Sequence, residues 1–213
     1  MAATRGAVPG NWLARESPGV RKRISAFRSA AAERSGWTEK RGTTDTDRPH
    51  VKRGIGMASM VHVGGGAKIY RSDGCGTIVK LDDFGNATVL TGSSEIGQGS
   101  ETVIAQMVAT ELSIDVADVR VINNDTDVTP WDVGVHASRT TFVAGNSARL
   151  TAIKAREKIL AEAATRLKTG DKPLGLADGN IVDTATGDVV APLAKFIRSL
   201  HFSDKNDVVI TSH

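Results

Sequence analysis

The segment TGSSEIGQGSETVIAQMVATEL, from Thr91 to Leu112, joins a glycine-spaced loop directly to a predicted helix. After the loop, apolar residues recur at helical spacing, at Val103, Ile104, Met107, Val108 and Leu112. Ser100 is suited to cap the helix start, and Glu101 complements the positive end of the helix dipole. N–H groups at a helix start lack intrahelical partners, and glycines let a ligand approach the backbone. The segment therefore predicts an anion site at Gly97, Gln98 and Gly99, where the neutral Gln98 amide can both donate and accept.

A simpler interpretation of this loop stays open. A tight strand-to-helix turn needs two glycines and no ligand, and the loop matches neither the P-loop nor the dinucleotide-binding fingerprint. Glu95, just ahead of the glycines, can be a buried carboxylate or a helix cap, and we assign it no catalytic role. Taken alone, the loop favours the turn.

A second polar loop, HASRTTFVAGNSAR from His136 to Arg149, also leads into a predicted helix. Its hydroxyl groups can donate to an anion, the Arg139 guanidinium matches the geometry of a phosphate, and Gly145 permits close backbone approach. Apolar residues at helical spacing begin at Leu150 and stop near Lys168, so we expect the helix there. Two such loops predict one extended polyanionic ligand between two helix starts, although a helix start rich in serine and threonine also accounts for the second loop.

The remaining elements mix helix and strand without a regular repeat, which predicts an α+β fold. We expect a basic amphipathic helix from Gly19 to about Gly36 and then a surface loop, together forming an N-terminal part over residues 1–53. The second part, residues 54–213, carries both polar loops. Its other expected elements are a hairpin (76–81 and 86–92), a strand (118–124), a small hairpin (179–191) and a short helix (192–202).

Composition restricts the class of protein. The 213 residues are 40% hydrophobic and 24% charged, which is ordinary for a globular protein, and a net charge of +3 is too small to indicate a nucleic-acid partner. The single cysteine, Cys75, excludes a disulfide framework, a cysteine zinc site and an iron–sulfur cluster bound by this chain alone. His62, His136 and His201 lack metal-ligand spacing, and only His136 adjoins a polar loop. No segment has the apolar length of a membrane span and we recognise no secretory signal, so we expect a cytoplasmic protein.

Three segments together resemble one protein family: RGIGMASMVHVGGG (53–66), GSSEIGQGSETVIAQMVATEL (92–112) and DVRVINNDTDVTPWDVGVHASRTTFVAGNSA (118–148). In order and spacing they are similar to the molybdenum-binding large subunit of the xanthine oxidase/aldehyde oxidase family, the molybdenum hydroxylases. The resemblance runs from about Ser35 to near the C-terminus. It implies an oxidoreductase subunit that binds a molybdopterin cofactor with molybdenum, in bacteria usually the cytosine dinucleotide form, in a domain that is incomplete relative to the family.

The resemblance also implies roles for residues of both loops. Gln98 takes the place of the family's glutamine that approaches a metal-bound oxygen, and it is the one residue we expect at the catalytic centre. We expect no residue of this chain to bind the metal directly. The residues that match the family's cofactor-holding segments are Gly97, Gln98, Gly99, Ser100, Thr102, Ala137, Ser138, Arg139, Thr140, Thr141, Gly145 and Asn146.

The family's large subunit is longer than this chain, and its general-base glutamate and two upstream loops have no counterpart here. Because the chain begins with Met1, we expect a naturally split subunit in preference to a fragment, completed by the remaining part of the molybdenum subunit on another chain. The resemblance places [2Fe–2S] clusters and FAD on partner subunits. The substrate is implied to be a small organic molecule, with aldehydes, aromatic thioesters, N-heterocycles and steroid-like ketones all open, in either the oxidative or the reductive direction.

Two other functions stay open. A non-catalytic scaffold or pseudo-subunit would keep the fold for assembly while its redox site is empty. A phosphate- or nucleotide-binding module unrelated to molybdenum would use the same loops, but neither loop contains the lysine that such modules use.

Overall fold

The computed structural model describes residues 18–43, 47–48, 50–59, 62, 73–203 and 209–213. The chain forms two compact units, Met1–Val61 and His62–His213, whereas the sequence predicted a division after Arg53. The glycines at 64–66, part of the first segment that resembles the family, lie outside the described residues. All of the predicted site residues belong to the second unit.

The first unit contains the predicted basic helix. Helix α1 spans Pro18–Ser35, and the short helix α2 spans Trp37–Lys40. Gly36 separates them because its φ of 64° is left-handed and cannot continue an α-helix. Phe27, one of the apolar residues that predict α1, is 74% exposed, so the described part of the chain does not bury this side chain.

A four-stranded sheet forms one layer of the second unit, in the order β3-β2-β1-β7. Strands β1 (Thr77–Leu81) and β2 (Ala87–Thr91) form the predicted antiparallel hairpin. Strand β3 (Val119–Ile122), also predicted, runs parallel to β2, and β7 (Ile210–Ser212) adds to β1 in antiparallel orientation. Alternate residues of β1 and β2 are buried because successive side chains point to opposite faces of a sheet.

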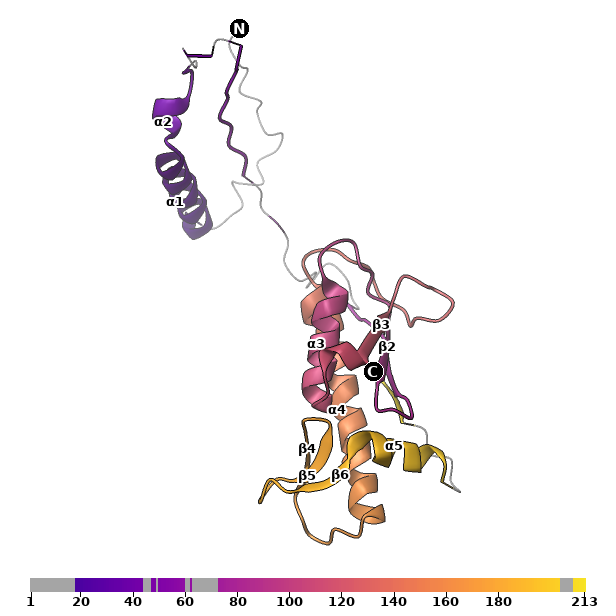
Figure 1. Cartoon of the computed structure of the whole chain (residues 1–213). Helices are drawn as coiled ribbons and strands as arrows, with labels where there is room; N and C mark the ends of the chain where they lie inside the picture. The colour runs from indigo at the N-terminus through magenta and orange to yellow at the C-terminus, as the bar shows by residue number, and fades with distance from the viewer. Residues whose placement is uncertain (1–17, 44–46, 49, 60–61, 63–72, 204–208) are drawn as a thin grey trace. The chain divides into compact units, whose positions relative to one another are not determined.

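Two helices pack side by side against the buried face of this sheet (Figure 1). Helix α3 spans Ser100–Leu112 and ends ahead of a 3₁₀ turn, η2 (Val116–Asp118), and helix α4 spans Thr140–Arg166. The core between the layers contains Val79, Leu81, Ala87, Val89, Ile104, Val108, Leu112, Ala144, Ala148, Ala152, Ala155 and Ile159. Because the two predicted loops lead directly into α3 and α4, the core that packs these helices also positions the loops.

Helix α4 begins at Thr140, so the prediction that it begins near Leu150 is wrong. Its first turns bury small and hydroxylated residues, among them Ala144, Gly145 and Ser147. Such residues leave no periodic pattern of large apolar side chains, and Leu150 itself is 39% exposed. The segment from Thr140 onward, predicted as loop, is therefore helical.

A three-stranded antiparallel sheet lies beside the C-terminal half of α4 (Figure 1). Its strands are β4 (Leu174–Ala177), β5 (Asn180–Asp183) and β6 (Val189–Pro192), and helix α5 (Leu193–His201) follows directly. The β5–β6 hairpin and α5 were predicted from the sequence, and β4 and β7 were not. The α+β class is confirmed.

Candidate functional site

The glycine loop ahead of α3 is held by a carboxylate of the chain itself. Glu95 Oε1 accepts hydrogen bonds from the N–H groups of Gly97 (2.7 Å) and Gly99 (3.0 Å). Its Oε2 accepts from the Ser100 hydroxyl (3.0 Å) and the Glu101 N–H (3.3 Å). The Gly99 N–H above all, and then the other donors, lower the pKa of Glu95 from 4.5 to about 2. Glu95 is therefore an ionised cap at neutral pH.

This arrangement corrects two predictions for the loop. Gly99, with a φ of 77°, is the N-cap of α3, and Ser100 is the first helical residue, with its hydroxyl turned toward Glu95. The N–H groups of Gly97, Gly99 and Glu101 donate to Glu95, so an external anion cannot use them without displacing the carboxylate. Of the two alternatives for Glu95, the helix cap is confirmed.

The Gln98 carboxamide is bonded within the same loop. Its Oε1 accepts from the Ile96 N–H (2.7 Å), and its Nε2 donates to the Ser94 carbonyl (2.9 Å) and to Ser100 Oγ (3.1 Å). The residue is nevertheless exposed, and a Cβ built at Gly97 would meet no atom within 4 Å. The loop thus presents a rigidly bonded amide beside open space.

The second loop turns sharply into α4. Ala137 (φ 50°) and Ser138 (φ 55°) are consecutive left-handed residues, a conformation that costs about 1–2 kcal/mol for each residue with a Cβ. The turn is closed by the Arg139 N–H, which donates to the His136 carbonyl (3.1 Å). The Ser138 hydroxyl is hydrogen-bonded to His62 Nε2 at 3.2 Å. Strain of this kind persists only where surrounding contacts impose it, and it is concentrated at binding sites.

The two loops line one cavity of about 380 Å³. Gln98 from the first loop and Ser138 from the second both line it, so the structure brings the two loops to one place. The lining residues are His62, Ile96, Gln98, Val135, His136, Ala137, Ser138, Thr140 and Thr141. Among these described lining residues, the polar groups are hydroxyl, amide and imidazole groups, which could bond to a ligand.

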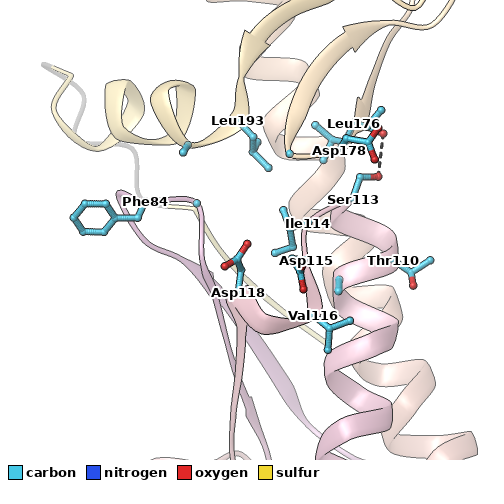
Figure 2. Close-up of a pocket in the computed structure, with 15 residues that line it drawn as sticks. Phe84, Thr110, Ser113, Ile114, Asp115, Val116, Asp118, Leu176, Asp178 and Leu193 are labelled. Atoms are coloured by element: carbon cyan, nitrogen blue, oxygen red, sulfur yellow. Dashed lines mark hydrogen bonds between the residues drawn. The ribbon is translucent and has the colours of Figure 1, made fainter.

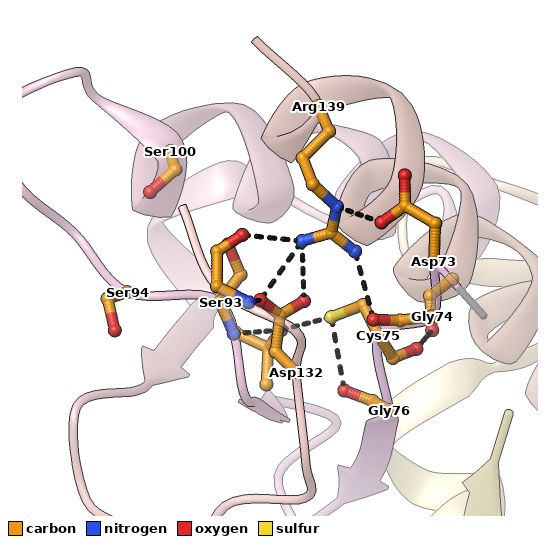
Figure 3. Close-up of polar contacts among 12 residues, drawn as sticks. Asp73, Gly74, Cys75, Gly76, Ser93, Ser94, Ser100, Asp132 and Arg139 are labelled. Atoms are coloured by element: carbon orange, nitrogen blue, oxygen red, sulfur yellow. Dashed lines mark hydrogen bonds and ion pairs between the residues drawn. The ribbon is translucent and has the colours of Figure 1, made fainter. Parts of the chain in front are cut away.

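Arg139 is a structural anchor beneath the second loop (Figure 3). Its side chain has no exposed area, and Nη1 donates to both carboxylate oxygens of Asp132 at 3.0 Å and to the Gly134 carbonyl at 2.8 Å. Nη2 donates to the Gly74 carbonyl at 2.9 Å, and Nε pairs with the Asp73 carboxylate. The prediction that this guanidinium binds a phosphate is wrong, because the side chain is turned into the protein and is bonded there.

Six other predicted residues do not line the cavity: Gly97, Gly99, Ser100, Thr102, Gly145 and Asn146. Thr102 is exposed on α3 and does not line it. Gly145 faces the neighbouring helix, since a Cβ there would lie 2.7 Å from Met107 Sδ. The Asn146 amide donates to the Phe142 carbonyl (2.6 Å) within α4. In contrast, His62 lines the cavity although no local sequence signal identifies it.

A larger cavity, of about 810 Å³, lies at the other end of α3 (Figure 2). Residues of the β1–β2 turn, the β4–β5 turn and the start of α5 line it, and none of them was predicted as a site residue. Its titratable groups are Asp115, Asp118 and Asp178. Because three carboxylates repel an anionic ligand, the smaller cavity is the candidate site for a polyanion.

The described residues contain neither a metal-binding cluster nor a membrane-spanning helix. No group of three or more histidine, cysteine, aspartate or glutamate side chains is placed to hold a metal ion in this part of the chain. Of the helices that the structure describes, none combines the length and the apolar character needed to cross a membrane.

Comparison with known proteins identifies the family of this chain. The family model for the molybdopterin cofactor-binding domain matches residues 30–212. The chain is 37% identical over 151 residues to the putative xanthine dehydrogenase molybdenum-binding subunit XdhA of Escherichia coli K12, covering 68% of the chain and 19% of the relative. It is 35% identical over 150 residues to the 6-hydroxypseudooxynicotine dehydrogenase complex subunit gamma of Paenarthrobacter nicotinovorans, covering 70% and 18%. The chain thus spans about a fifth of the length of these relatives.

Solved structures share the fold. Quinoline 2-oxidoreductase from Pseudomonas putida 86 superposes with a TM-score of 0.57 at 26% identity, over 65% of this chain and 18% of that one. Cu,Mo-CO dehydrogenase superposes with a TM-score of 0.62 at 22% identity, over 72% and 20%. The family model covers most of the chain and the relatives agree with it, so the chain belongs to the molybdopterin cofactor-binding domain family, with relatives of the xanthine dehydrogenase type.

Proposed function

We propose that this chain supplies the Gln98 loop and the Ser138 loop of the cofactor site in a multi-subunit molybdenum hydroxylase or dehydrogenase. The observation that carries the proposal is the single cavity that both loops line. The residues present fit the cofactor in two respects. Open space lies beside Gly97 and Gly99, where an added Cβ would meet nothing within 4 Å, and hydroxyl donors cluster at the α4 start.

In this proposal the two loops have different tasks. The hydroxyl groups of Ser138, Thr140 and Thr141 would bind the phosphate and pterin oxygens of the cofactor, favoured by the positive end of the α4 dipole. Gln98 would face the metal end with a neutral amide. The cofactor, when bound, supplies two-electron redox chemistry and the exchange of oxygen with a substrate carbon. We propose that the general base belongs to the part of the enzyme outside this chain, as the family resemblance implies.

We propose the remaining components from the relatives. The names of two relatives describe a molybdenum-binding subunit and a subunit of a dehydrogenase complex, which supports an assembly of several chains. Because the chain has one cysteine, [2Fe–2S] clusters would lie on a partner, together with FAD. We propose the cytosine dinucleotide form of the cofactor, a small organic substrate and a cytoplasmic location.

Cofactor content tests the proposal. The complex purified through this chain should contain molybdenum by mass spectrometry and pterin by fluorescence. Thr141→Val removes one cavity hydroxyl at nearly constant volume, and we expect molybdenum and pterin to fall about tenfold or more at limiting cofactor, as for a lost hydrogen bond to a charged group. Thr102→Val is the matched control, an exposed threonine in the first turn of α3 outside the cavity. Neither metal nor pterin in a fully assembled wild-type complex would refute the proposal.

Gln98→Ala separates an enzyme from a scaffold. In an active site this variant should lower turnover, whereas a scaffold would keep assembly and show unchanged cofactor content and turnover. A nucleotide-binding module would bind nucleotide without molybdenum, so titration of the isolated chain with nucleotide separates this function from the proposed one.

A further inference from the structure

We infer that Glu95 is a positioning residue that, acting through Ser100 and the two loop glycines, sets the direction in which the Gln98 carboxamide faces the cavity. An effect of Glu95 on cofactor binding rests on the proposed function, whereas its effect on the orientation of Gln98 concerns this chain alone. It starts from the direct contact of Ser100 with both side chains, Oγ lying 3.0 Å from Glu95 Oε2 and 3.1 Å from Gln98 Nε2.

The direction of each hydrogen bond follows from the number of available protons. A serine hydroxyl has one proton to donate, and an ionised carboxylate can only accept. Ser100 must therefore donate to Glu95, and its lone pair must accept from the Gln98 amide. Through Ser100, Glu95 thereby favours the orientation in which the NH₂ group of Gln98, and not its oxygen, points toward the start of α3.

Two backbone contacts support the same orientation. The Ser94 carbonyl can only accept, and it lies 2.9 Å from Gln98 Nε2. The Ile96 N–H can only donate, and it lies 2.7 Å from Gln98 Oε1. Rotating the amide by half a turn would place oxygen against oxygen and N–H against N–H at all three partners, so a single orientation satisfies the loop.

Glu95 also shapes the backbone on either side of Gln98. Its Oε1 holds the N–H groups of Gly97 and Gly99, whose φ values of 98° and 77° form the turn that presents the side chain. A neutral amide in place of this carboxylate would bring an NH₂ group to one of these donors or to Ser100. The Ser100 proton would then be free to turn toward Gln98, and one of the three contacts that set the present orientation would be lost.

The side-chain amide of Gln98 reports directly on this inference. In the uniformly ¹⁵N-labelled full chain we expect its two amide protons to give separate resonances with slow solvent exchange. Glu95→Gln should speed their exchange about tenfold or more, since a hydrogen-bond chain anchored on a charged acceptor is broken. Glu101→Gln, which removes the same charge from the same helix start but leaves the network, should change the exchange less than about twofold.

A second variant covers the case in which Glu95→Gln does not fold. Ser100→Ala removes only the bridge, so exchange of the Gln98 amide should rise while the Gly97 and Gly99 N–H groups stay protected by Glu95. Unchanged exchange of the Gln98 amide in both variants, or an equal effect of Glu101→Gln, would overturn the inference.

Turnover of the assembled complex then separates this inference from the proposed function. In the assembled complex, Glu95→Gln and Gln98→Ala should lower turnover to a similar extent, and the double variant should be no worse than Gln98→Ala alone, because both act through one group. If Gln98→Ala has no effect on turnover, the proposed function fails, while the exchange measurements still decide the role of Glu95. If the two substitutions add independently, the positioning role of Glu95 in the complex is refuted.

Discussion

Replacing Arg139 by methionine should destabilise the protein more than any exposed ion-pair substitution. The change leaves the Asp132 carboxylate, whose side chain is 1% exposed, without its cation. Breaking a buried pair in this way typically costs about 3–5 kcal/mol. The Gly134 and Gly74 carbonyls lose their hydrogen-bond donors as well, but the free-energy costs of these losses are not additive with that of the broken ion pair. Because the total free energy of unfolding of a domain is about 5–15 kcal/mol, the loss is a large fraction of it.

Urea unfolding followed by circular dichroism measures this loss. We expect a lower midpoint at unchanged slope, with a fall in melting temperature of roughly 6–20 °C at about 2–4 °C per kcal/mol. Arg149→Met is the matched control on the same helix, since its side chain is 51% exposed and pairs with Glu111 at 2.8 Å, and it should cost less than about 1 kcal/mol. In a double-mutant cycle, Asp132→Asn should recover part of the loss. An Arg139→Met protein within about 1 kcal/mol of wild type would refute the assignment of this residue as a buried anchor.

Three further outcomes are expected. Burial raises the pKa of the Cys75 thiol from 9.0 to about 11. Near pH 8 the thiolate fraction of the folded protein, and therefore its rate of alkylation by iodoacetamide, should be about 100-fold below that of an ordinary thiol, and unfolding should restore it. Rapid alkylation of the native protein would contradict this. Because the folded pKa of Glu95 is depressed to about 2, its stabilising contribution is complete above about pH 4.5 and lost as the pH falls toward 2, so Glu95→Gln should show a shallower decline of stability over that window than wild type. Gly145→Val should lower the free energy of unfolding by about 1–3 kcal/mol through collision with the Met107 side chain, and Met107→Ala should partly rescue it; an unchanged urea midpoint for Gly145→Val would show that the helices can separate freely.

Local signals in the sequence were sufficient for most elements near the site. The β1–β2 hairpin, α3, β3 and α5 each combine a clear hydrophobic period with turn residues at their ends, and these predictions are confirmed. Strand β7 has only three residues and is stabilised by pairing with the edge of β1. Its formation therefore depends on the neighbouring strand, and a local sequence pattern does not predict it. The start of α4 at Thr140 was not predicted because the buried face of its first turns consists of alanine, glycine, serine and threonine. These small residues pack by close approach and do not form a periodic pattern of large apolar side chains.

The sequence by itself indicated two polar loops as the candidate site, because glycine and hydroxyl residues directly before a helix indicate a local backbone geometry. Only the tertiary structure decided what each side chain of those loops does. Arg139 has the chemistry of a phosphate ligand, and two aspartates close to it in space turn it into a buried anchor. Glu95 could be read as a cap or a buried carboxylate, and its four hydrogen bonds settle the choice. The physical reason is that a helix start or a guanidinium binds whichever anion lies within reach, and reach depends on contacts between residues that are distant in the sequence.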